Sequence, residues 1–206
     1  MKTFIATIEG TTPMLQNRFD ETAEMADANS RKVHIRKEDP REVAERAAHR
    51  NADGHLFFPG AAIARLLREA GSAHKQRGSR KSLRYIIPAA ILVQEEKIIL
   101  RDSFGEPITD FEVDSRSVVI PSTKGRIMRH RPRLNSWACE FTLEIDDDTI
   151  DPVLAHQLLV EGGSKIGLGD FRPEKGGPFG RFHVVSWAEL KAVKVEPKMK
   201  GVRVPA

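Results

Sequence analysis

Alternating hydrophobic and polar residues predict the strands of a sheet at separate places in the chain. The clearest alternation covers residues 137–145, where Trp137, Cys139 and Phe141 share a face with later hydrophobic positions. Successive side chains of a strand point to opposite faces, so this segment is a half-buried strand. Strands are also expected over residues 2–9, 89–100, 110–121 and 179–187, the second of them as one strand or a bent pair.

Hydrophobic residues at helical spacing predict two helices that pack on the sheet. Residues 61–73 carry Ile63, Leu66, Leu67 and Ala70 on one face. Residues 152–161 follow Asp151, a favourable N-cap, and their apolar side is expected to contain Val153, Leu154, Leu158 and Leu159. A third, shorter helix is expected over 40–51, with Asp39 as N-cap and Pro40 in the first turn.

The order of these elements is β-α-β-β-α-β, which predicts an α+β fold of the ferredoxin-like (RRM-like) type. Residues 1–190 are expected to form a single domain, and residues 191–206 a basic C-terminal extension. Two additions interrupt the core: a charged insertion over residues 17–54 and a long central hairpin over residues 110–145. Because proline cannot donate to a strand ladder, Pro132 is expected to interrupt the pairing or lie at an edge. Many unrelated functions use this fold.

Composition narrows the class of protein. The chain has 206 residues, a formal net charge of +4 and a single cysteine, so an intrachain disulfide framework is excluded. The N-terminus lacks the hydrophobic region of a signal peptide and no run is long enough to cross a bilayer, so a soluble, cytoplasmic protein is expected. The acidic run 146–148 lacks the remaining ligands of a calcium loop, so neither a metal nor another cofactor is predicted.

Glycine is concentrated in residues 162–187, between the second helix and the last strand. Glycine allows positive φ and close approach of the backbone to another molecule. Basic residues are spread through the same stretch, so it is a candidate phosphate cradle, although a turn-rich surface loop has the same composition. The glycines are Gly162, Gly163, Gly167, Gly169, Gly176, Gly177 and Gly180, and the basic residues are Lys165, Arg172, Lys175 and Arg181.

Basic residues gather in two further stretches, so binding to a nucleic-acid backbone is a candidate function. Aromatic residues that could support a base are few: Phe171 and Phe179 lie among the glycines, whereas Phe57, Phe58 and Trp137 are expected in the core. Recognition would then depend on backbone and shape more than on base sequence. The first stretch contains Lys75, Arg77, Arg80, Lys81 and Arg84, and the second contains Lys124, Arg126, Arg129, Arg131 and Arg133.

Three short segments together resemble the RAMP (repeat-associated mysterious protein) superfamily of CRISPR systems. They are the Thr-Pro turn of residues 12–15, the Pro-Gly segment and basic helix of residues 58–68, and the glycine-rich entry to the last strand over residues 167–182. The resemblance is to a backbone subunit of CRISPR effector complexes, in a divergent or minimal form. The charged segment 170–175 is longer than the minimal loop of that family.

The resemblance implies an RNA-binding subunit of an antiviral ribonucleoprotein, with the 110–145 hairpin as a protruding thumb. Its expected partners are a guide RNA with or without a target strand, further copies of the chain and other effector subunits. No membrane contact is expected. The predicted RNA contacts are Lys75, Arg77, Arg80, Lys81, Lys124, Arg126, Arg129, Arg131, Lys165, Gly167, Gly169, Phe171, Arg172, Lys175, Gly176, Gly177 and Arg181.

Two other functions remain open. The first is a guide-processing or target-cleaving RAMP endoribonuclease. RAMP endonucleases that process guide RNA often use histidine, and His34 and His130 lie in basic surroundings. Some backbone subunits cut target RNA with an acidic residue after the first strand, where Asp20 and Asp27 lie. No spacing selects one of these residues, so no catalytic residue is assigned and intrinsic catalysis is not expected. The second alternative is a structural assembly protein that binds no RNA.

Overall fold

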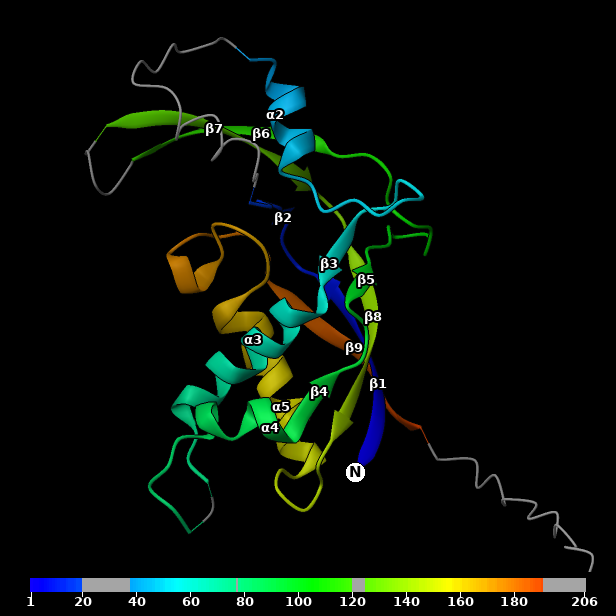
Figure 1. Cartoon of the computed structure of the whole chain (residues 1–206), viewed down its shortest axis with the longest axis vertical. Helices are drawn as coiled ribbons and strands as arrows, with labels where there is room; N and C mark the ends of the chain where they lie inside the picture. The colour runs from blue at the N-terminus through cyan, green and yellow to red at the C-terminus, as the bar shows by residue number, and fades with distance from the viewer. Residues whose placement is uncertain (20–37, 77, 120–124, 191–206) are drawn as a thin grey trace, which may run out of the picture.

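The protein has a mixed α and β fold with antiparallel sheets (Figure 1). The computed structural model describes residues 1–19, 38–76, 78–119 and 125–190. Over these residues no helix combines the length and the hydropathy that crossing a membrane requires.

The main sheet has the strand order β4-β8-β1-β9, and each strand is antiparallel to its neighbours. These strands are Ile91–Val93 (β4), Ala138–Ile145 (β8), Lys2–Gly10 (β1) and Phe182–Leu190 (β9). The prediction that residues 137–145 form a half-buried strand is confirmed, because Cys139, Phe141 and Leu143 of β8 are buried. Burial raises the pKa of the Cys139 thiol to about 12.

The expected strand over residues 89–100 is divided between two sheets. Its first part forms the short helix α4 (Ile87–Ala90) and then β4, at the edge of the main sheet. Its second part is β5 (Lys97–Ile99), which pairs with β3 (Phe57–Pro59) in a separate two-stranded sheet. The bent-pair alternative is therefore the correct one.

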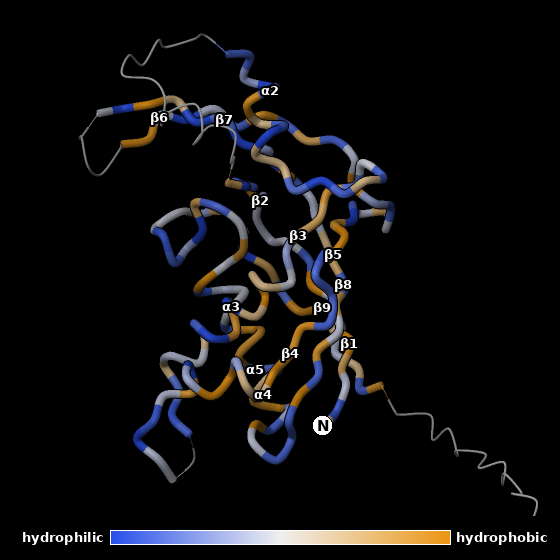
Figure 2. The backbone as a smooth tube through the Cα atoms, in the orientation of Figure 1, coloured by the Kyte–Doolittle hydropathy of each residue, from blue (hydrophilic) through white to orange (hydrophobic). Residues whose placement is uncertain are grey.

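Two helices, α3 (Gly60–Ala70) and α5 (Pro152–Glu161), pack on one face of the main sheet (Figure 1). The predicted buried face of α3 is confirmed. In α5 the Asp151 side chain accepts a hydrogen bond from the Val153 amide, as expected of an N-cap, but the prediction of a buried Val153 is wrong because 74% of it is exposed. The buried positions are Ala155, Leu158 and Leu159, a stripe that leaves Val153 outside. Hydrophobic residues gather where α4, α5 and β4 meet (Figure 2).

Shorter helical turns complete the helical layer. They are 3₁₀ turns at Gly71–Ala73, Leu83–Tyr85 and Pro173–Lys175, and a π-helical turn at Gly162–Ile166 that continues α5.

The segment 110–145 is not one hairpin. Its first two strands, β6 (Glu112–Val119) and β7 (Arg126–Leu134), form a hairpin, whereas β8 belongs to the main sheet. Residues 120–124, which connect β6 to β7, lie outside the described residues. Pro132 does not interrupt the β6–β7 ladder of the three-stranded sheet β2-β7-β6, because it pairs with Val113, but it does lie at an edge: β2 (Met14–Leu15) pairs with β7 only at Arg133 and Leu134. The Pro132 carbonyl accepts from the Gln16 amide, just beyond β2, so its missing N–H faces the side where that strand has ended.

The described part of the charged insertion packs on this hairpin. Helix α2 (Pro40–Arg46) begins at the predicted N-cap Asp39, ends earlier than expected, and buries Ala44. The Arg41 guanidinium lies 4.0 Å from the centre of the Phe111 ring and pairs with Asp110. The described part of the insertion and the hairpin therefore lie together, at the top of Figure 1.

Candidate nucleic-acid interface

Residues 167–181, here called the glycine loop, are fastened to three other parts of the protein. The Asp170 amide donates to the Leu15 carbonyl at 2.7 Å, which ties the loop to β2. Asp170 also pairs with Arg131 of β7 at 2.7 Å, and Glu174 pairs with Arg65 of α3 at 3.0 Å. The loop is thus held between the hairpin and α3 (Figure 1).

Most glycines of the 162–187 stretch make room for the chain itself. A Cβ on Gly162 would lie 2.2 Å from the Leu66 side chain, and a Cβ on Gly163 would lie 2.5 Å from the Phe182 carbonyl oxygen. Within the loop, Gly169 and Gly177 approach the carbonyl oxygens of Leu15 and Phe171 in the same way. Gly167 and Gly180 are also crowded, by Pro173 and by the Leu168 carbonyl.

Gly176 is the exception among the glycines of the loop. Its φ is +74°, and a Cβ there would meet nothing within 4 Å. The amides of Gly167, Gly176, Gly177 and Gly180 all donate to carbonyl groups of the chain. Those amides are therefore occupied in this structure, so contacts to an anion here would come chiefly from side chains.

The basic side chains of the stretch divide into paired and unpaired groups. Arg172 donates to the Gly169 carbonyl at 2.8 Å and pairs with Glu174 at 2.6 Å. Burial opposes ionisation of Glu174, but the hydrogen bond and charge of Arg172 outweigh it and lower its pKa. Lys165 pairs with Glu161 at 2.9 Å. Lys175 and Arg181 are exposed, and neither forms an ion pair with another described residue.

The predicted basic residues of β7 also have different surroundings. Arg131 is 8% exposed and is held by Asp170, whereas Arg126 and Arg129 are exposed and have no ion pair among the described residues. Arg133 donates to the Asn135 side chain at 2.8 Å. Arg129 and Arg131 are two positions apart, so both lie on the strand face that meets the glycine loop.

Two aromatic rings lie where β6 approaches the loop. Phe179 is 5% exposed, and the Arg116 guanidinium covers its ring at 4.8 Å from the centroid. Phe171 has an unusual φ of +47° and is 36% exposed; its ring centre lies 6.1 Å from that of Phe179. Arg116 is opposite Arg129 in the β6–β7 register. The hairpin and the glycine loop therefore bring cations and an accessible ring to one place, and Phe171 is the better candidate for stacking on a base.

The first basic stretch lies apart from this junction. Lys75, Arg80 and Lys81 are exposed in the loop that follows α3, seen as a hydrophilic segment at the lower left of Figure 2. Arg84 pairs with Glu69 of α3 at 3.1 Å. Two of the three basic stretches therefore converge. Arg77 and Lys124, and with them His34, Asp20 and Asp27, lie outside the described residues.

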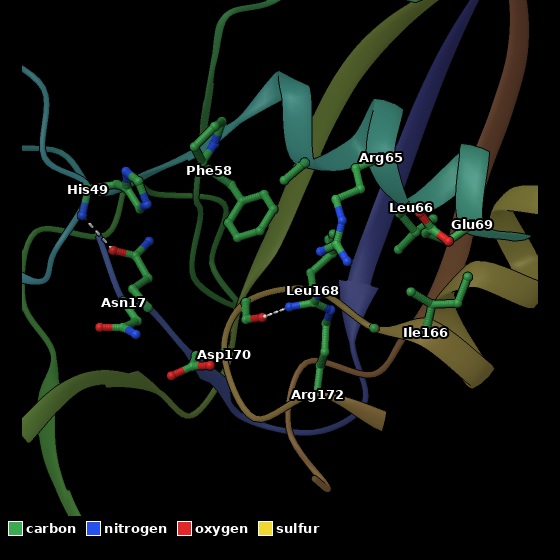
Figure 3. Close-up of a pocket in the computed structure, with 15 residues that line it drawn as sticks. Asn17, His49, Phe58, Arg65, Leu66, Glu69, Ile166, Leu168, Asp170 and Arg172 are labelled. Atoms are coloured by element: carbon green, nitrogen blue, oxygen red, sulfur yellow. Dashed lines mark hydrogen bonds between the residues drawn. The ribbon is translucent and has the colours of Figure 1, made fainter. Parts of the chain in front are cut away.

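A cleft of about 220 Å³ separates the glycine loop from α3 (Figure 3). The apolar walls of the cleft are formed by Phe58, Leu66 and Leu168. The side chains of Arg65 and Arg172 point toward each other from opposite sides of it (Figure 3). Arg65 and Arg172 share Glu174 as their acidic partner. The cleft therefore has a mixed lining, with apolar walls and polar side chains, and Glu174 neutralises the two arginines.

Sequence reasoning missed the residues at the other end of this cleft, Gln16, Asn17 and His49. The Gln16 side chain is 1% exposed and bridges two segments: it donates to the Phe57 carbonyl at 2.9 Å and accepts from the His49 amide at 2.8 Å. Burial, and secondarily the charge of Arg18, lowers the pKa of His49. No local pattern marks these residues, because their partners are distant in sequence.

Glu161 provides a pH-dependent test of the packing beside the loop. Hydrogen bonds from Lys165, Gln157 and His74 lower its pKa from 4.5 to about 2. A lowered carboxyl pKa stabilises the fold above pH 4.5, and this contribution disappears as the pH falls toward 2. In urea unfolding, Glu161→Gln should be less stable than the parent at pH 6, and the difference should shrink at pH 3. Glu140→Gln, at an exposed site with no basic partner in the described chain, is the control; a constant Glu161→Gln deficit would contradict the assignment.

No protein-family model and no curated protein matches the chain. Solved structures that are similar to it include the following two. One is Cmr6 from Pyrococcus furiosus, with a TM-score of 0.42 and 12% identity over 88% of this chain and 97% of that one. The other is a chain of a Type IV-B CRISPR complex, with a TM-score of 0.43 and 12% identity over 98% of this chain and 95% of that one.

Proposed function

We propose that the chain is an RNA-binding subunit of a CRISPR-type ribonucleoprotein, with a ferredoxin-like domain over residues 1–190. In this proposal it assembles with further copies and with other effector subunits along a guide RNA in the cytoplasm. The fold part is supported by the strand order β4-β8-β1-β9, with α3 between β1 and β4 and α5 between β8 and β9. The family part is supported by the three RAMP-like segments of the sequence.

The observation that carries RNA binding is a set of cations, where the hairpin meets the glycine loop, that have no ion pair within the described part of the chain. Arg129 of β7 and Lys175 and Arg181 of the loop are exposed and have no ion pair with another described residue, while neighbouring cations are neutralised by acids. Cations left without acidic partners on adjoining elements favour a polyanion. Contacts from side chains to phosphates, with Phe171 as a stacking surface, would give affinity with little sequence preference.

The test is the salt dependence of binding to a labelled single-stranded RNA. Each phosphate contact contributes about 0.7 to the slope of log affinity against log salt for a single strand. Lys175→Gln and Arg181→Gln should each reduce the slope by about 0.7 and weaken binding about fourfold at 0.15 M salt. The slope comes from fluorescence anisotropy titrations between about 50 and 200 mM salt, a range over which phosphate contacts change affinity strongly.

Lys2→Gln is the matched control. It removes the same charge at the start of β1, where Lys2 lies 3.9 Å from Glu189, away from the glycine loop. Equal slopes for the parent, Lys175→Gln and Arg181→Gln would reject the loop as a phosphate contact. A chain that binds no RNA at low salt, and assembles after nuclease treatment, would favour the structural alternative.

RNA cleavage has one specific observation in its favour. The Nδ1 atom of His130 lies 2.7 Å from the Ser115 hydroxyl across the hairpin, which orients the ring on the face of β7 opposite Arg129. Cleavage by general acid–base chemistry would need a second titratable group near the same phosphate. Incubation with labelled RNA in the absence of metal decides this candidate: a discrete product that His130→Ala abolishes would support it, and intact RNA would reject it.

A further inference from the structure

A groove of about 490 Å³ runs along β4, away from the glycine loop. One wall is α3, through Ala61 and Ala64, and the other is β4, through Ile91 and Val93, which α4 extends with Ile87. The groove is predominantly apolar. It lies at an edge of the main sheet, because β4 pairs with β8 alone.

The backbone of β4 offers unused hydrogen-bonding groups to this groove. The Gln94 amide donates to Thr142 at 3.0 Å, and the Ala90 carbonyl accepts from Asp146 at 2.8 Å, so even-numbered positions face β8. Backbone groups alternate in an antiparallel pair, so those of Ile91 and Val93 point away from the sheet. Within the described chain, the Val93 amide and the carbonyls of both residues have no strand beside them. Such an edge is a template for an added strand.

The chain carries a segment suited to this edge after Leu190. Residues 201–205 read Gly-Val-Arg-Val-Pro. The two valines flank the arginine, and the glycine and proline on either side are residue types that commonly bound a strand. The alternating part is as long as β4. Valines at alternate positions would point to one side, toward an apolar groove, and Arg203 would point to the other.

The length of the intervening chain allows the same molecule to supply this strand. Leu190 pairs with Thr3, and Ile91 pairs with Ile145, which is opposite Lys2, so β9 ends at the same end of the sheet where β4 begins. With strands about 4.8 Å apart, the outer side of β4 is about 19 Å from β9. Residues 191–196 can span about 20 Å when extended. Residues 202–204 would then lie beside β4, running parallel to it.

Charge favours this path. Acidic residues lie at the same end of the sheet, in the loop 146–148 that follows β8 and at Glu189 of β9. Asp148 is exposed and has no ion pair with another described residue. The segment that would pass them is basic: it contains Lys191, Lys194, Lys198, Lys200 and Arg203 against the single acid Glu196.

We propose that residues 202–204 add to the outer edge of β4 in the same molecule, with Val202 and Val204 in the groove between α3 and β4. The added strand uses the free backbone groups of Ile91 and Val93. It places Arg203 on the open face of the sheet beside Leu92, which is 57% exposed. The sheet edge is thereby closed to pairing with other chains. This proposal does not rest on RNA binding.

Disulfide trapping tests the contact in the full-length chain. Ala61→Cys in the groove and Val204→Cys in the segment should form an intramolecular disulfide under mild oxidation, detected by mass spectrometry. Cys139 will not compete, because it is 1% exposed and its thiol pKa is raised to about 12. Phe104→Cys with Val204→Cys is the control, since Phe104 is 88% exposed but does not line the groove, and it should remain reduced.

Hydrogen exchange of the Val93 amide gives an independent measurement. In the parent chain this amide should exchange at least tenfold more slowly than in the Val202→Asp/Val204→Asp variant, and the rate should not depend on protein concentration. Equal rates in the two proteins would overturn the proposal. Disulfide-linked dimers, with protection that grows with concentration, would also overturn it, because the occupant would then be a second copy.

Discussion

Gly169→Ala is expected to destabilise the protein by about 3 kcal/mol, whereas Gly176→Ala is expected to cost about 1 kcal/mol. Both glycines have positive φ, +78° and +74°, so a side chain is strained at either position. Only Gly169 is also crowded: a Cβ would lie 2.3 Å from the Leu15 carbonyl oxygen, whose backbone cannot move without disturbing β2. The difference between the two variants isolates the effect of crowding from that of backbone strain.

Urea unfolding followed by circular dichroism measures both variants against the parent. Gly176→Ala is the matched control because it has the same backbone conformation and open space around it. The RNA-binding slope of Gly176→Ala should remain that of the parent if side chains make the phosphate contacts. Equal free energies of unfolding for the two variants would show that the loop is not packed against β2 in solution.

Breaking the Arg131–Asp170 ion pair is expected to cause the other large loss of stability. Replacing either residue alone should lower the free energy of unfolding by about 3 kcal/mol. The Arg131 side chain is 10% exposed and that of Asp170 is 28% exposed, so removing one partner leaves the other poorly solvated. The two atoms are 2.7 Å apart, but neither has a hydrogen bond of good geometry, so the attraction is mainly between charges. Arg131→Met/Asp170→Leu replaces both charges with apolar side chains and should recover most of the loss.

The double-mutant cycle compares the parent with Arg131→Met, Asp170→Leu and the double variant by urea unfolding. A double variant more stable than the sum of the single effects gives the coupling between hairpin and loop. Additive losses would contradict a direct interaction. Arg129→Gln, two positions along β7, is the control: it should leave stability unchanged while reducing the salt slope of RNA binding.

Local features of the sequence were sufficient to place most of the core. The alternation in β8 follows from one buried face, and the N-caps Asp39 and Asp151 act on amides two residues away. These features can be predicted from the sequence because the interacting residues lie within one helical turn or one strand. The strand 89–100 was harder, because its two halves pair with β8 and β3, which are far apart in the chain.

The candidate site depended on long-range contacts that no local pattern encodes. Arg131 and Lys175 look alike in the sequence, yet Arg131 is buried against Asp170 and Lys175 is exposed. The glycines also look alike, but Gly169 makes room for Leu15 and Gly176 faces open space. The sequence by itself therefore determined most strands of the main sheet, the two helices packed on it, and which segments are rich in cations and glycine. Only the tertiary structure decided which of those cations are free, because neutralisation depends on acids brought close by folding.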